Sequence, residues 1–136
     1  MNMKSQQPGL QHVRKVLQAN LSNPDTCLAA IDAAESLIKH IWEFNSRLLG
    51  DGGARAVLAR AVSLAVADAP LLQKVTVNKK GLDSSQLREH VENAGCDAGE
   101  VLNSFIHLGE MIFFTLADLT GDLMTAPLLQ QLERDK

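Results

Sequence analysis

The sequence predicts an all-α protein, a single-domain bundle of about five to six helices, two of them long. The 136 residues include 21 Leu and 16 Ala, but only four Phe, one Trp and no Tyr. Leu and Ala lose little side-chain entropy in a helix, whereas β-sheet cores favour β-branched and aromatic residues. Apolar residues also recur at helical spacing, and Asp, Ser and Gly stand where such helices should begin and end.

The length of 136 residues suits one domain with a real core. We expect residues 1–9 to form a flexible N-terminus and residues 10–136 to form one helical domain. Residues 48–51 (Leu-Leu-Gly-Asp) recur 71 positions later as residues 119–122 (Leu-Thr-Gly-Asp). This echo indicates two αα-hairpin-like halves, 24–70 and 97–134. The alternative is chance, because glycine stops and Asp caps are common in helical proteins.

The first two helices follow from helical spacing and from a strong start signal. We expect a short helix from Leu10 to Asn20, then a long one that begins at residues 22–25 (Ser-Asn-Pro-Asp) and stops at Gly50. At 100° per residue the long helix is amphipathic. Its apolar stripe consists of Cys27, Ala30, Ile31, Ala34, Leu37, Ile38, Ile41, Phe44, Leu48 and Leu49, and its solvated back of Asp32, Ser36, Lys39, Glu43 and Arg47.

The middle of the chain is rich in alanine and holds the one segment where β structure is plausible. A third helix should follow residues 51–53 and end before Pro70, with seven Ala that allow close helix packing. Residues 71–72 should form a helical turn, and Val75–Val77 a short extended segment. Residues 83–86 fit a capping box for a fourth helix that ends at Gly95.

A fifth, long helix should start at a capping box of Asp97 and Glu100 and stop at Gly121. Its apolar residues cover more than half of its circumference, so it should be either central or shared with a partner. Gly109 would admit a crossing helix, for which Ala30 and Ala34 are suitable neighbours. The chain should close with a helix over 126–133. The apolar set is Val101, Leu102, Phe105, Ile106, Leu108, Met111, Ile112, Phe113, Leu116 and Leu119.

Charge is unevenly distributed along the chain, whose formal net charge is −3. Residues 1–88 carry a balance of +4 and residues 89–136 a balance of −7, and no Lys or Arg lies between Arg88 and Arg134. This polarity would help one half or one subunit dock on another, unless it is a chance imbalance of solvated faces. Residues 87–108 superficially resemble a helix-turn-helix, but their second helix lacks cations, so we expect no nucleic-acid partner.

The compartment expected from the sequence is the cytoplasm, without a membrane contact. The N-terminal residues lack the apolar core of a signal peptide, and no apolar run is long enough to span a membrane. Cys27 and Cys96 are far apart and show no metal-binding spacing, so we expect neither a zinc knuckle nor a disulfide scaffold. We expect Cys27 to be a buried, inert thiol and Cys96 to be the more exposed one.

Two H-x-x-E pairs, His40 with Glu43 and His107 with Glu110, are the candidate metal ligands. Residues three apart share a helix face, so two such helices could offer four ligands to one metal. Known di-metal bundles have Glu before His and point both inward, whereas these pairs lie on polar backs. We therefore expect ordinary solvated pairing and no bound cofactor. The chain also lacks any motif that pairs a nucleophile with a base, so we expect no enzymatic activity.

Met111, Phe113 and Phe114 are the candidate interface residues. Met111 and Phe113 fit the edge of a broad core stripe, but Phe114 stands opposite its centre and is hard to bury within one chain. We therefore expect a non-enzymatic interaction module with a regulatory or signalling role, which acts through protein contacts as a homodimer. The alternative is a small-ligand or metal sensor with its site between the helices.

Overall fold

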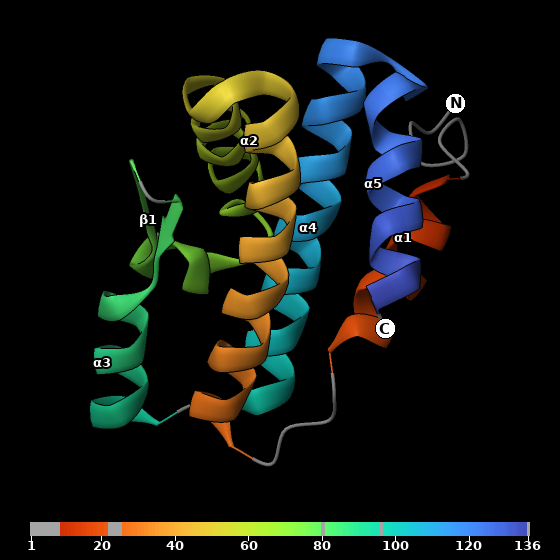
Figure 1. Cartoon of the computed structure of the whole chain (residues 1–136). Coiled ribbons are helices and arrows are strands. Elements are labelled where there is room, and N and C mark those ends of the chain that lie inside the picture. The colour runs from red at the N-terminus through yellow and green to blue at the C-terminus, as the bar shows by residue number, and fades with distance from the viewer. Residues whose placement is uncertain (1–8, 22–25, 80, 96, 136) are drawn as a thin grey trace.

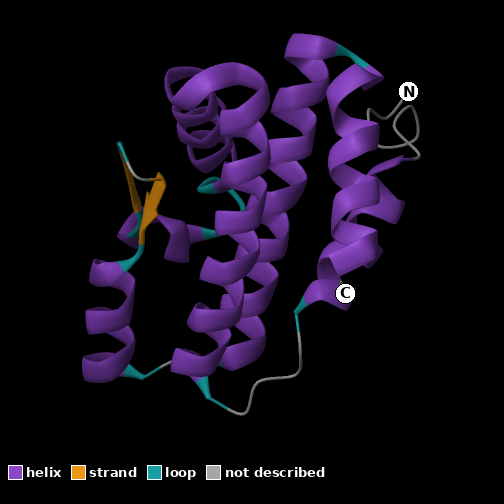
Figure 2. Cartoon of the chain, in the orientation of Figure 1, coloured by secondary structure: helices purple, strands orange, loops and turns teal. Residues whose placement is uncertain are grey.

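A computed structural model describes residues 9–21, 26–79, 81–95 and 97–135. Its helices confirm the all-α prediction, and within the described ranges a single two-stranded hairpin is the only β structure (Figure 2). The helices are α1 (Gly9–Asn20), α2 (Cys27–Ala65), the 3-10 helix η2 (Pro70–Lys74), α3 (Ser85–Ala94), α4 (Ala98–Thr120) and α5 (Asp122–Asp135). The antiparallel strands are β1 (Thr76–Asn78) and β2 (Gly81–Asp83), with Val77 opposite Leu82.

Helix α4 lies in the middle of the bundle. The first arm of α2 runs beside it in the same direction, α1 and α5 pack on its far side, and α3 and the hairpin flank α2 (Figure 1). The apolar breadth of α4 is therefore explained within one chain, because neighbours cover it on several sides. No helix within the described ranges is both long and apolar enough to cross a membrane.

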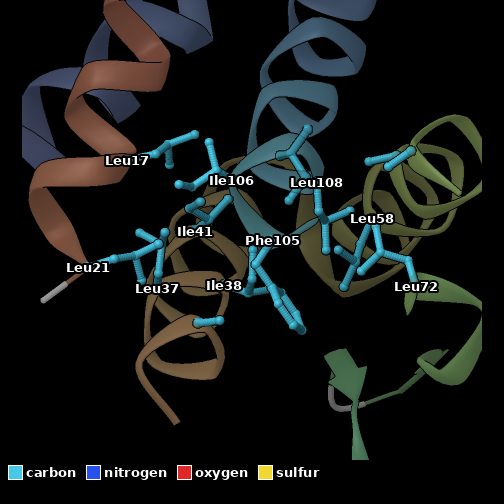
Figure 3. Close-up of a cluster of buried hydrophobic side chains, with 14 of the residues drawn as sticks. Leu17, Leu21, Leu37, Ile38, Ile41, Leu58, Leu72, Phe105, Ile106 and Leu108 are labelled. Carbon is cyan, nitrogen blue, oxygen red and sulfur yellow. The ribbon is translucent and has the colours of Figure 1, made fainter. Parts of the chain in front are cut away.

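One contiguous core holds these helices together. Burying a large apolar side chain contributes about 1.5–3 kcal/mol, so these contacts supply most of the favourable free energy of folding. Figure 3 shows how the side chains converge: Leu17 from α1, Leu21 directly after it, Leu37, Ile38, Ile41 and Leu58 from α2, Leu72 from η2, and Phe105, Ile106 and Leu108 from α4.

The two long helices begin and end alike, at the spacing that the sequence echo predicts. The Thr26 and Asp97 side chains cap α2 and α4, and these residues lie 71 positions apart. Gly50 and Gly121, at the same separation, take positive φ angles of 78° and 67°. Because L-residues rarely adopt such angles, glycine allows the chain to turn there. Gly50 thus divides α2 into two arms, and the second turns behind the first in Figure 1.

The short helices α1 and α3 pack on different long helices. Helix α1 packs on α4 and α5, while α3 packs on α2 and η2. An arginine forms an ion pair across each contact. Arg14 Nη1 lies 2.9 Å from Glu110 Oε1 of α4, and Arg88 Nη2 pairs with both Asp32 and Glu35 of α2. Each short helix is thus fastened to a long helix both by packing and by an ion pair.

Several helix starts differ from the predictions. The start predicted at residues 22–25 lies outside the described residues, and the cap of α2 is Thr26. The capping box at 83–86 does not form. Instead, Asp83 Oδ1 accepts the Ser85 backbone N–H at 3.0 Å and the Ser85 hydroxyl. The closing helix begins at Asp122 rather than Ala126, with Pro127 in its second turn.

Some burial predictions also fail. Leu48 and Leu119, both assigned to apolar stripes, are exposed, whereas Asn45 and Thr115 are buried. A hydroxyl or amide can occupy a core position when it falls on the buried face, and hydrophobic spacing does not identify it. The helix that crosses closely at Gly109 is α1, through Leu17, and not the Ala30 and Ala34 face of α2.

Candidate functional site

A cavity of about 370 Å³ opens where the chain leaves α2 and meets the first turns of α4. We call it the acidic pocket. Its size lies within the range of small-molecule sites in proteins. The pocket is lined by Asp68, Ala69, Pro70, Asp97, Gly99, Glu100, Asn103, Ser104 and His107.

Local sequence explains how these residues come together. Asp97 caps α4, because its carboxylate accepts the Gly99 N–H at 2.9 Å. Residues three and four apart share a helix face, so Glu100, Ser104 and His107 follow Asp97 along one side of α4. The opposite wall forms where α2 ends, and there the Ala69 N–H bonds to the Ala65 carbonyl oxygen before Pro70 opens η2.

The pocket carries negative charge. Asp68, Asp97 and Glu100 contribute carboxylates, and within the described ranges no Lys or Arg belongs to its lining. The Asp68 side chain is 78% exposed, so this carboxylate stands at the rim where a ligand from solvent would meet it. Walls of one charge sign concentrate the electrostatic field and attract ligands of opposite sign.

One buried polar atom in the wall makes no hydrogen bond to the described residues. His107 Nε2 has no hydrogen-bond partner within the described part of the chain, and the carboxylate that faces it, Asp68 Oδ2, lies 3.4 Å away. Ser104 is only 6% exposed and lines the same cavity. Most buried polar groups in native proteins are satisfied, so an unbonded buried nitrogen beside a cavity calls for an explanation. A ligand or ordered water in the pocket would provide one.

His107 connects the pocket to α1 through two carboxylates. Its Nε2 lies 3.4 Å from Asp68 Oδ2 and its Nδ1 lies 3.6 Å from Glu110 Oε1. Glu110 in turn accepts a hydrogen bond from Arg14 at 2.9 Å. A continuous series of polar side-chain contacts therefore runs from the rim of the pocket to α1, through Asp68, His107, Glu110 and Arg14.

The predicted four-residue metal set does not come together. His107 and Glu110 approach each other, but His40 and Glu43 are exposed on the solvated back of α2. Within the described ranges no three His, Cys, Asp or Glu residues are grouped as a metal ion would require. Of these four residues, His107 lines the acidic pocket.

The pocket does not present an activated nucleophile. Both ring nitrogens of His107 face carboxylates, and the Ser104 hydroxyl donates no hydrogen bond to the imidazole. Serine hydrolase chemistry needs such a serine–histidine contact. The arrangement is suited to binding a ligand through charge and hydrogen bonds.

Two further cavities among the described residues differ from the acidic pocket. A cavity of about 10 Å³ beside Asn45 has room for roughly one water, which would satisfy the unpaired Asn45 Oδ1. A cavity of about 320 Å³ lies between α2 and β2, lined by Trp42, Leu82 and other residues of both signs of charge. One of those residues, Glu35, is already paired with Arg88.

The predicted interface residues are less exposed to solvent than their spacing indicates. Phe113 is 3% exposed and packs in the core, as its place at the edge of the apolar stripe allows. Met111 and Phe114 are half-buried. Leu119, which was assigned to the core, is 63% exposed. The end of α4 near Leu119 is thus more exposed than the segment around Phe113.

Cys27 corrects another prediction. It is disulfide-bonded, and the described residues include no free cysteine. The expected inert thiol at Cys27 is therefore wrong. Cys96, the other cysteine of the chain, lies outside the described residues.

No known protein family matches this chain, and neither curated proteins nor solved structures show a match to it. The assignment of a function thus depends on the acidic pocket itself. Sequence reasoning found His107 but missed Asp68, Asn103 and Ser104. One sequence signal for the pocket was Ser104, because it falls within the apolar arc of α4, where its side chain is expected to be buried.

Proposed function

We propose that this protein is a non-enzymatic binding module, and that it engages a protein partner through the acidic pocket. The observation that carries the proposal is His107 Nε2, a buried atom that makes no hydrogen bond to the described residues, beside a cavity rimmed by carboxylates. Unsatisfied buried polar groups cost about 1–3 kcal/mol each, and a bound partner would recover this cost.

As expected from the sequence, we propose that the protein acts through contacts with another protein. We assign those contacts to the acidic pocket and not to the apolar surface of α4. The homodimer was expected because α4 has a wide apolar surface. Within one chain, α1, α2 and α5 already cover α4, so a dimer is not needed to bury it. Self-association would have to use what is left exposed, which includes Leu48 and Leu119. A regulatory or signalling role would follow from partner binding.

A small-ligand sensor is the second candidate, supported by the cavity of about 320 Å³ beside Trp42. The indole and Leu82 offer apolar contacts, while Lys39 and Glu43 offer one charge of each sign. Native mass spectrometry of the purified protein separates the two candidates. A co-purified small molecule that is lost in Trp42→Ala supports the sensor.

The compartment also forms part of the proposal. Disulfides persist in oxidising compartments and are rare in the reducing cytoplasm. The disulfide at Cys27 therefore supports a working location outside the reducing cytoplasm, contrary to the cytoplasmic location expected from the sequence. Alkylation of free thiols at the moment of cell lysis tests whether Cys27 is oxidised in the cell.

Site-specific photo-crosslinking tests the proposed function. A photoreactive residue at Asn103, which is exposed and lines the pocket, should capture a discrete protein partner in cells. The matched control replaces Asn93, an exposed asparagine of α3 outside the pocket. The Asn103 adduct should disappear in Glu100→Gln. Equal labelling from both positions, or no adduct at Asn103, would contradict the proposal.

A further inference from the structure

We propose that the group bound in the acidic pocket is an organic cation, a guanidinium or alkylammonium group of the kind carried by arginine and lysine side chains and by polyamines. This inference rests on the proposed function and specifies its ligand chemistry.

Charge sets the sign of the ligand. Asp68, Asp97 and Glu100 face the cavity, and the described lining includes no Lys or Arg to balance them. Asp97 uses Oδ1 to cap α4, which leaves its second oxygen available. The segment that supplies most of the lining, residues 89–136, carries a balance of −7. An anionic ligand would meet repulsion here, and a cation would be attracted.

Size favours an organic group over a bare metal ion. Ca²⁺ and Mg²⁺ need several oxygen ligands that converge to about 2.0–2.6 Å from the ion. Within the described ranges no such grouping of His, Cys, Asp and Glu exists. A cavity of about 370 Å³ is also far larger than one ion, whereas it can admit the end of an arginine or lysine side chain or a short polyamine.

The buried polar groups complete the match. A guanidinium presents five N–H donors and an ammonium three, and neither has an acceptor. The rim carboxylates accept charge-assisted hydrogen bonds from such donors. Deeper in the wall, Ser104 is only 6% exposed and lines the cavity, and its hydroxyl can accept a further hydrogen bond. A cation therefore matches both the rim carboxylates and the acceptor deeper in the wall.

Isothermal titration of the full chain tests the proposal with two probes, spermidine and an unstructured hexa-arginine peptide. We expect saturable binding of at least one probe at one site per chain. Binding of spermidine alone indicates a free polyamine as the source, and binding of the peptide alone indicates a protein partner. Binding of both supports the shared chemistry. Succinate and Mg²⁺ should not saturate the site.

Matched variants distinguish binding in the acidic pocket from attraction by the overall negative charge of residues 89–136. Asp68→Asn with Glu100→Gln should weaken binding by about tenfold or more, because each charge-assisted hydrogen bond contributes enough for such a factor. Glu89→Gln with Glu92→Gln removes the same charge from exposed positions of α3 and should change affinity by less than about twofold. Ser104→Ala should weaken binding without lowering thermal stability.

Three results would overturn the proposal: binding of neither probe, an equal loss in both charge-neutralised pairs, or unchanged affinity in the Asp68 and Glu100 pair. Failure of this inference differs from failure of the proposed function. A partner that still cross-links at Asn103 without cation binding would retain the binding module and reject the ligand class. Spermidine binding without a cross-linked protein would do the reverse.

Discussion

Leu17 of α1 lies so close to Gly109 of α4 that a Cβ atom at position 109 would stand 2.7 Å from Leu17 Cδ1. Leu17 is fully buried, so its side chain has little room to withdraw. The glycine thus allows α1 to seat on α4, close to the Arg14–Glu110 pair that fastens the same two helices.

Substitution of Gly109 by alanine should destabilise the protein by about 1 kcal/mol. The gain in helix propensity of about 0.5–1 kcal/mol is outweighed by overpacking, which typically costs about 1–3 kcal/mol. Urea unfolding of Gly109→Ala measures the loss. In a Leu17→Ala background the clash disappears, and the same substitution should become neutral or stabilising. A loss of equal size in both backgrounds would show that the close contact is not the cause.

The neighbouring phenylalanines of α4 should respond differently to truncation. Phe113 is 3% exposed and Phe114 is half-buried. We expect Phe113→Ala to lower the free energy of unfolding by about 3–5 kcal/mol, and Phe114→Ala to lower it by markedly less, since less apolar area is lost. Denaturant melts of both variants give the comparison. The reverse order would mean that Phe114 is the residue covered in solution.

The disulfide at Cys27 should contribute to stability. Disulfides typically stabilise a fold by about 2–4 kcal/mol, so reduction or Cys27→Ser should lower the melting temperature clearly. Thermal melts with and without reductant measure the effect, and Cys27→Ser should be insensitive to reductant. If protein purified without reductant and then denatured shows two free thiols per chain, the disulfide is absent in solution.

Acid should selectively remove the contribution of Asp83. Hydrogen bonds from the Ser85 hydroxyl and backbone N–H lower the pKa of Asp83 from its ordinary value of 3.8. A lowered pKa means that the carboxylate stabilises the fold above about pH 4, and that this contribution fades as the pH falls through the folded-state value.

Asp83→Asn should therefore be less stable than the parent chain at about pH 6, and this deficit should shrink at about pH 2.5. Urea unfolding at the two values measures the difference. The exposed Glu92→Gln is a suitable control, because no contact of its side chain is seen among the described residues. A deficit in Asp83→Asn that is the same at both pH values would contradict the assigned hydrogen bonds.

Local signals predicted much of the fold. Asp97 and Gly121 mark the ends of α4 as expected, because capping and positive φ depend on a few adjacent residues. The recurrence at 71 positions also has a structural counterpart in the caps and the glycine turns. The helix N-termini at 83–86 and 122–126 were less predictable, since several polar residues compete there to cap or extend a helix.

The acidic pocket was largely hidden from the sequence. Asp68 and His107 lie 39 positions apart and meet only because α2 turns at Gly50 and returns its second arm toward α4. Helical spacing placed His107 on a polar back but did not reveal the carboxylate opposite it. The same limitation affected Gly109, for which the sequence indicated a crossing helix without identifying α1.

The most direct test of the account is a backbone-amide NMR titration of the full chain with spermidine and with the hexa-arginine peptide. The account predicts that saturating shift changes concentrate on residues 68–70 and 97–107, where the acidic pocket lies. They should be abolished by Asp68→Asn with Glu100→Gln but not by Glu89→Gln with Glu92→Gln. Shifts spread evenly over the acidic half of the chain, or no saturable shift with either probe, would contradict the central claim that this pocket binds an organic cation.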